Sequence, residues 1–181
     1  MKLISVVSTC FKEELNVTEL YERVRAVLAA FPQYRYEHIF IDNSSTDTTV
    51  DILRKLAAAD RNVKVIVNSR NFGHLRSPVH ALYQTSGDAV ILLLSDLQDP
   101  PELLNEMLVE WQNGTPVVLG IKNTSEESGL MFAIRTAYYR TVAQLASVDV
   151  FEHFTGSASM IVRSSTSCGP GLTTPILIFG E

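Results

Sequence analysis

The sequence lacks the marks of several common protein classes. It has only two cysteines, Cys10 and Cys168, too few for a disulfide framework or a cysteine metal site, which favours a reduced, cytoplasmic setting. The net charge is −5 and no stripe of Lys and Arg is present, so we expect no nucleic acid partner. No apolar run reaches the roughly 18 residues of a transmembrane helix. Charged residues at 12–14 follow the apolar N-terminus, so no signal peptide is expected.

Two common phosphate-binding motifs are also missing. Neither G-x-G-x-x-G nor G-x-x-x-x-G-K-[ST] occurs, which counts against a dinucleotide or P-loop protein. The four histidines have no spacing typical of metal ligands. The 181 residues, 46% of them hydrophobic, are enough for one domain with a buried core, and no pattern in them sets an oligomeric state.

Short apolar runs alternate with amphipathic stretches along the chain. Strands are expected at residues 3–7, 38–41, 63–67, 89–94 and 116–121, and helices near residues 16–31, 50–56, 79–85, 103–111 and 125–147. This alternation predicts an α/β protein with a Rossmann-like, doubly wound and mostly parallel sheet that carries helices on both faces. Right-handed crossovers would bring the polar strand ends to one edge of that sheet.

The clearest strand, Ala89–Leu94, runs into the polar segment SDLQDPPE at residues 95–102. Ligands of open α/β sheets bind outside the carboxyl ends of the strands. Hard cations such as Mg²⁺ or Mn²⁺ use carboxylate oxygens together with substrate phosphates. Asp96 and Asp99 are therefore candidates for a metal and diphosphate site. The alternative is that they only cap the helix that follows.

Three other strands also end in polar segments, at residues 9–16, 42–47 and 68–73. We expect Asp42 and Asp96 to face one shared pocket at this edge of the sheet. The alternatives are local. Asp42 and Asp47 would build an Asx-turn and a helix cap, and Arg70 would be a solvated surface residue rather than a phosphate ligand.

Taken together, these segments resemble the inverting family 2 glycosyltransferases of the GT-A fold, and within them the polyprenyl-phosphate sugar transferases. CFKEELN at residues 10–16 resembles C-Y-N-E-E-x-N, and DNSSTDTT at 42–49 resembles D-D-G-S-T-D-x-T. RNFG at 70–73 repeats the family motif, and SDLQDPPE resembles D-A-D-L-Q-D-P-P-E. The resemblance covers residues 3–156. Thr9, Asn43 and Leu94 depart from it, where the family has Pro, Asp and Asp.

The resemblance implies transfer of a sugar from a UDP- or GDP-linked donor to a polyprenyl phosphate, with Mg²⁺ or Mn²⁺. It implies that Asp42 binds the base or ribose and that Glu13 contacts the nucleotide. Asp96 would bind the cation, with Gln98 beside it. The other nucleotide-sugar contacts that we expect are Thr9, Phe11, Asn43, Ser45, Arg70, Asn71 and Ser95. Full-length relatives would act at the cytoplasmic face of the membrane.

The last part of the chain departs from the family after Gly156. EHFTG at residues 152–156 resembles E-N-F-T-G, but SASMIV then stands where the family has F-G-L-Y-D-R. The Asp that the family has in the acceptor-side region, where a general base is expected, is therefore missing, and no catalytic residue is assigned. Codons for F-G-L-Y-D-R read one base later can encode SASMIV. We therefore expect a domain at residues 1–156, a frameshift after Gly156 and an irregular, out-of-frame tail at 157–181, which translation of the gene in the neighbouring frame would test.

Two other functions stay open from the sequence. One is a truncated module that binds nucleotide and metal without catalysis, with little turnover of its own. The other is a nucleotidyltransferase, a class with similar sheet and metal chemistry. The lack of a glycine-rich phosphate loop after the first strand counts against the second of these.

Overall fold

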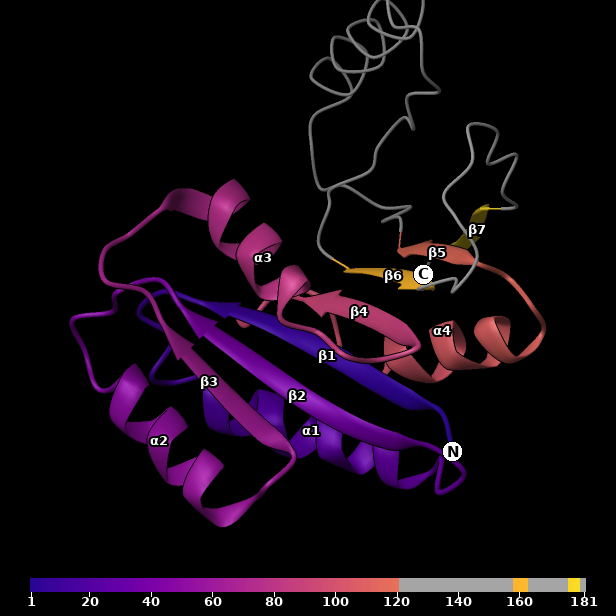
Figure 1. The fold of residues 1–181 in the computed structure, drawn as a ribbon, viewed down its shortest axis with the longest axis horizontal. Helices are drawn as coiled ribbons and strands as arrows, with labels where there is room; N and C mark the ends of the chain where they lie inside the picture. The colour runs from indigo at the N-terminus through magenta and orange to yellow at the C-terminus, as the bar shows by residue number, and fades with distance from the viewer. Residues whose placement is uncertain (121–157, 163–175, 180–181) are drawn as a thin grey trace, which may run out of the picture.

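The computed structural model describes residues 1–120, 158–162 and 176–179 (Figure 1). The strands in these residues are β1 (Leu3–Cys10), β2 (Arg35–Asp42), β3 (Val63–Val67), β4 (Ala89–Leu93), β5 (Val117–Gly120), β6 (Ala158–Val162) and β7 (Ile176–Phe179). The helices are α1 (Val17–Ala29), α2 (Thr49–Ala59), α3 (Gly73–Tyr83) and α4 (Leu103–Gln112).

The described strands form one sheet in the order β3-β2-β1-β4-β6-β5-β7. Strands β1 to β4 pair in parallel, β6 runs antiparallel between β4 and β5, and β7 is parallel to β5. Along β1 and β2 the register runs from Leu3 opposite Arg35 to Cys10 opposite Asp42. The two strands therefore end level with one another. The predicted α/β class with a mostly parallel sheet is confirmed.

Helices cover both faces of the sheet, as predicted (Figure 1). On one face, the buried side chains of α1 and α4 pack on β1 and β4 through a core that includes Val6 and Ile91. On the other face, Ala81 of α3 packs with Val7 and Ile39. The alternation of side chains along each strand separates these two cores, since Val6 and Val7 point to opposite faces.

Several element boundaries differ from the predicted ones. β1 continues to Cys10, and α3 begins at Gly73 rather than near Val79. Pro78 lies inside α3, where it removes only the one N–H that would bond the carbonyl oxygen of His74. The helix predicted over 125–147 and the EHFTG segment lie outside the described residues.

The tail after Gly156, which we predicted to be irregular, differs from that prediction. It contains two strands of the sheet, β6 and β7. Both are rich in apolar residues, with Ser159 the one polar residue in the two strands, and this composition favours a strand whatever the origin of the segment. Gly156 itself lies outside the described residues, and a frameshift after it stays a prediction. In the part of the chain that the structure describes, no helix is long and apolar enough to cross a membrane.

Candidate functional site

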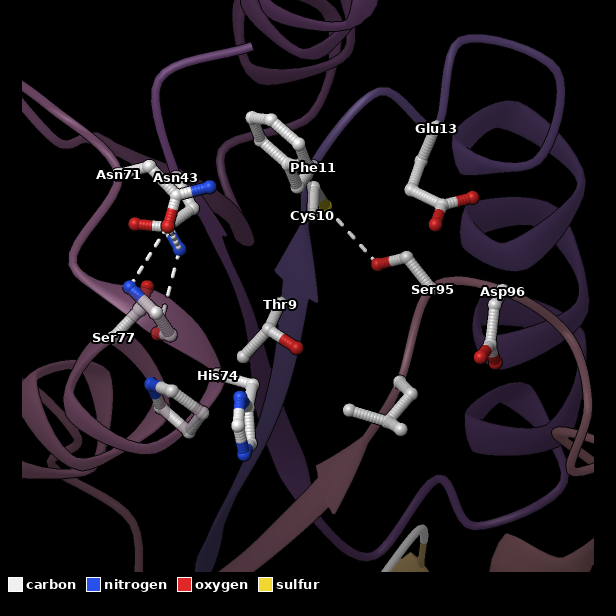
Figure 2. Close-up of a pocket in the computed structure, with 13 residues that line it drawn as sticks. Thr9, Cys10, Phe11, Glu13, Asn43, Asn71, His74, Ser77, Ser95 and Asp96 are labelled. Atoms are coloured by element: carbon white, nitrogen blue, oxygen red, sulfur yellow. Dashed lines mark hydrogen bonds between the residues drawn. The ribbon is translucent and has the colours of Figure 1, made fainter.

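A hollow of about 380 Å³ lies beyond the carboxyl ends of β1, β2 and β4 (Figure 2). Its wall on one side comes from α3, and its floor comes from the ends of β1 and β4. The lining residues are Thr9, Cys10, Phe11, Glu13, Asn43, Asn71, Gly73, His74, Ser77, Pro78, Leu94, Ser95 and Asp96. This is the edge where a parallel sheet binds its ligands.

The hollow brings together most of the residues that the sequence singled out. From four separate segments come Thr9, Phe11, Glu13, Asn43, Asn71, Ser95 and Asp96. Four predicted site residues are not among those that line it, namely Asp42, Ser45, Arg70 and Gln98. Arg70 is exposed, and its guanidinium stacks 4.7 Å from the centre of the Phe72 ring.

The prediction that Asp42 faces the same pocket as Asp96 differs from the structure. Asp42 is fully buried, and its carboxylate accepts hydrogen bonds from the backbone N–H of Ser45, at 2.8 Å, and from the Ser45 hydroxyl. Asn43 lines the hollow, whereas Asp42, the register partner of Cys10, is not among the lining residues and is held by Ser45 instead. The Ser45 hydroxyl also accepts a hydrogen bond from the Lys12 N–H at 2.9 Å. Asp42 therefore ties together the loops that follow β1 and β2.

The local alternatives proposed for these acids are met in part. Asp42 accepts a hydrogen bond from the Ser45 N–H three residues on, whereas Asp47 accepts one at 3.1 Å from the Thr49 N–H two residues on, which is the span of an Asx-turn. The N-cap residue of α2 is Thr48 rather than Asp47, and its side chain forms no capping hydrogen bond. Both carboxylates thus hold the loop between β2 and α2. That role is structural, and it positions Asn43 at the end of β2.

Asn43 organises the loop that leads into α3, a role that sequence reasoning missed. Its Nδ2 donates to Asn71 Oδ1 at 2.9 Å, and its Oδ1 accepts from the Phe72 N–H at 2.9 Å and from Asn68 Nδ2 at 3.2 Å. Only an amide both donates and accepts in this way, whereas an ionised Asp only accepts. The sequence did contain a signal for this role, because the resemblance expects Asp at position 43 and the chain has Asn there.

Two carboxylates, Glu13 and Asp96, lie on the same side of the hollow with Ser95 between them (Figure 2). Glu13 accepts a hydrogen bond from Asn16 Nδ2 at 2.7 Å, and Asp96 accepts one from the Gln98 N–H at 3.2 Å. Among the described residues, no Lys or Arg lines the hollow, and no three or more His, Cys, Asp or Glu cluster as metal ligands would. The site is therefore acidic, and in this part of the chain it is not a metal cage made by protein alone.

A contact between the end of β1 and the segment that follows β4 forms the floor of the hollow. The Cys10 Sγ and Ser95 Oγ atoms lie 3.0 Å apart and join the end of β1 to the chain leaving β4 (Figure 2). Burial raises the pKa of the Cys10 thiol to about 12, and the charges of Asp42 and Glu13 act in the same direction. The thiol is therefore neutral at physiological pH and is not a nucleophile.

Three residues in the loops around the hollow have backbone conformations that residues other than glycine rarely adopt. Lys12, Ser44 and Leu97 have φ values of 60°, 67° and 57°, and they follow β1, β2 and β4 respectively. Left-handed residues other than glycine are uncommon, and they concentrate where a surrounding structure holds them for function. Nothing in the sequence signalled them, because neither Lys nor Leu favours this conformation.

Known proteins match this chain along most of its length. The sequence profile described as "Glycosyl transferase family 2" matches residues 5–168. The uncharacterized glycosyltransferase YkcC of Bacillus subtilis is 34% identical over 81% of this chain and 45% of its own. The bactoprenol glucosyl transferase of Shigella phage SfX is 31% identical over 88% of this chain and 52% of its own. The chain thus spans about half the length of the curated relatives it matches.

The family match also corrects the extent of the resemblance. We expected the likeness to the family to end at Gly156, but the profile continues past that residue to 168. Strand β6, which pairs with β4, lies within this matched range.

A solved structure with a similar fold is TarS of S. aureus in complex with UDP-GlcNAc. It is 26% identical to this chain, with a TM-score of 0.55, and the match covers 71% of this chain and 36% of TarS. The GT-A fold that the sequence resemblance implied is confirmed.

Proposed function

Because this chain belongs to glycosyl transferase family 2, we propose that it transfers a sugar, with inversion, from a nucleoside diphosphate donor to a polyprenyl phosphate. The observation that carries this proposal is the acidic hollow at the ends of β1, β2 and β4. The bactoprenol in the name of the phage relative supports a lipid-phosphate acceptor, and the UDP-GlcNAc bound to TarS supports a nucleotide-sugar donor. The cytoplasmic face of the membrane is the proposed place of the reaction.

The charge of the hollow supports a divalent cation, Mg²⁺ or Mn²⁺. Glu13 and Asp96 are negative, no Lys or Arg of the described residues lines the hollow, and a diphosphate would be repelled without added positive charge. Such cations take one or two carboxylates together with water and substrate phosphates, and this donor set fits that need. Asp96 would hold the ion, with Glu13 beside it. When bound, the cation supplies charge neutralisation of the departing nucleoside diphosphate.

The residues of this chain then have separate tasks. Asp96 would hold the cation, with Glu13 beside it, and Asn43 fixes the loop that carries Asn71 at the opposite wall. Asp42 and Ser45 act as positioning residues behind that wall. We assign no general base. Ile161, opposite Val90 in the sheet, stands where the resemblance expects the Asp, so turnover by this chain should be low.

Calorimetry with UDP- and GDP-linked sugars, with and without Mn²⁺, tests this function. Asp96→Asn should remove the Mn²⁺-dependent part of donor binding and weaken affinity at least about tenfold, since it removes the one carboxylate expected to hold the ion. Asp51→Asn, at a side chain that is 69% exposed on α2, is the matched control and should bind as the parent does.

The outcomes distinguish the candidate functions. Donor binding that ignores both Mn²⁺ and Asp96→Asn would contradict the proposed site. Mn²⁺-dependent binding with no transfer of radiolabelled sugar to a polyprenyl phosphate would indicate the non-catalytic module. Release of pyrophosphate from a nucleoside triphosphate and a sugar phosphate would indicate a nucleotidyltransferase.

A further inference from the structure

The outer face of α3 exposes three large apolar side chains in a line. Leu75, Val79 and Tyr83 are 71%, 49% and 78% exposed. Their spacing of four residues places them on one side of the helix, one turn apart. Scattered exposed apolar residues are normal in proteins, but a continuous row on one helix indicates a contact surface.

These three residues are not needed to hold α3 on the sheet. The inner side of the helix provides that contact, because Ser77 and Ala81 are buried there. His74 and Pro78 on the same helix line the hollow. α3 therefore has one side for the core and the site, and an opposite side whose apolar row has no role in the fold of the described residues.

The charge around this row has the opposite sign to that of the chain. The chain has a net charge of −5, yet no Asp or Glu occurs between Arg61 and Gly87. Arg76 is exposed next to the row, and Arg70 is exposed just before the helix. Neither guanidinium forms an ion pair with the described residues. The apolar row is thus flanked by positive charge that this part of the chain does not neutralise.

We propose that the outer face of α3 docks on the surface of an anionic lipid bilayer. Apolar side chains and a Tyr, with Arg nearby and no Asp or Glu in the same stretch of sequence, are features of helices that lie in the interface of a membrane. A second copy of this chain is a poorer occupant, because a two-fold contact would place the same basic surface on both sides. The apolar row enters the interface, and the arginines face the anionic headgroups.

This inference goes beyond the proposed function, which gives the membrane as the place of the reaction but names no surface of the protein that meets it. One consequence does rest on the proposed function. The N-terminal turns of α3 line the hollow, so docking through α3 holds the hollow beside the bilayer. A lipid-phosphate acceptor would then meet the donor at the membrane surface, without leaving it.

Flotation with vesicles tests the docking surface, using the full chain without donor or metal. One set of vesicles contains phosphatidylglycerol mixed with phosphatidylcholine, and the other contains phosphatidylcholine alone. The parent chain should float with the anionic vesicles and less in high salt. A triple variant, Leu75→Ser with Val79→Ser and Tyr83→Ser, should lose at least about tenfold in binding, on the order expected for three apolar anchors. Arg76→Gln should lose about fivefold.

Val109→Ser, at a side chain that is 46% exposed on α4, is the control and should float as the parent does. Anionic vesicles that fail to bind the parent, or that bind the triple variant equally well, would overturn the proposal. A parent dimer that the triple variant converts to monomer, with no flotation of either, would show instead that a second copy covers the row.

Donor calorimetry separates this inference from the proposed function. The triple variant should keep its donor affinity, and Asp96→Asn should keep its flotation. Loss of only one property leaves the other proposal standing. A loss of both in the triple variant, with unchanged circular dichroism and thermal melting, would contradict the assignment of the row to membrane contact alone.

Discussion

The two edges of the sheet both gather polar residues, but they use them differently. At the carboxyl edge, Glu13, Asp96 and the amides of Asn43 and Asn71 surround a hollow. At the amino edge, Glu37 is only 4% exposed, and its carboxylate accepts hydrogen bonds from the Ser5 hydroxyl, Lys64 Nζ and the Ser86 N–H. At the first edge two carboxylates line the hollow, whereas at the second the Glu37 carboxylate is already hydrogen-bonded by donors of the protein itself.

The difference shows that a cavity or a buried acid alone does not identify a site. A hollow of about 400 Å³ also lies at the amino edge, lined in part by Tyr36, Arg61 and Lys64. Burial acts to raise the pKa of Glu37, but the hydrogen bonds from Lys64, Ser5 and Ser86 outweigh it and lower the pKa. What marks the carboxyl edge is the convergence of loops from three parallel strands.

Removal of Glu37 should have the largest effect on stability. Glu37→Ala leaves the Ser5 hydroxyl and the Ser86 N–H without their acceptor, so we expect the free energy of unfolding to fall by about 3 kcal/mol. Urea denaturation measures the loss, with Glu22→Ala on the exposed side of α1 as a control near zero. Donor affinity should not change. A parallel loss of donor binding would mean that the two edges are coupled.

A methyl group at Gly87 should have the next largest effect. A Cβ there would lie 2.6 Å from Ser5 Oγ and 2.7 Å from the Ala89 carbonyl oxygen, too close for either to remain in place. Gly87→Ala should therefore cost about 2 kcal/mol of stability. The adjacent Ser86→Ala, which keeps the backbone N–H, serves as control. An unchanged denaturation midpoint for Gly87→Ala would show that the amino edge is looser than its contacts indicate.

His38 follows Glu37 in β2. Unlike the Glu37 carboxylate, only one of the two ring nitrogens of His38 has a hydrogen-bond partner among the described residues. Its Nε2 lies 3.0 Å from the Ser8 hydroxyl, while its Nδ1 has no hydrogen-bond partner among the described residues. Burial lowers the pKa of His38 from 6.5 to about 3. As the pH falls, His38 therefore binds a proton at a higher pH in the unfolded chain than in the folded one. Its contribution to the stability of the folded state is complete only above pH 6.5.

Between pH 6.5 and about pH 3, protonation of His38 in the unfolded chain should lower the free energy of unfolding by about 1.4 kcal/mol for each pH unit of acidification. Denaturant unfolding at a series of pH values measures this slope. His38→Gln should make the profile flatter than that of the parent, while His74→Gln at the start of α3 should leave it unchanged. Equal slopes in the parent and His38→Gln would contradict burial as a neutral imidazole.

Much of this architecture could be predicted from the sequence, because its signals are local. The apolar run at Val63–Val67 set both ends of β3, and the polar segments placed Asp96 at the edge of the sheet. That Asn43 rather than Asp42 lines the hollow could not be predicted. It depends on the hydrogen bonds that Ser45 gives to the Asp42 carboxylate, and either residue would fit a polar loop. The position of β6 between β4 and β5 depends on long-range pairing, which no local pattern encodes.

The left-handed residues Lys12, Ser44 and Leu97 have a consequence for affinity. Each of the three loops around the hollow holds one residue in the left-handed region, and a hydrogen bond from the Lys12 N–H to Ser45 fixes the first of them. A ligand of the proposed class would therefore meet walls already in shape, and little chain entropy would be lost on association. Tight recognition of a small polar ligand becomes possible without a large buried area.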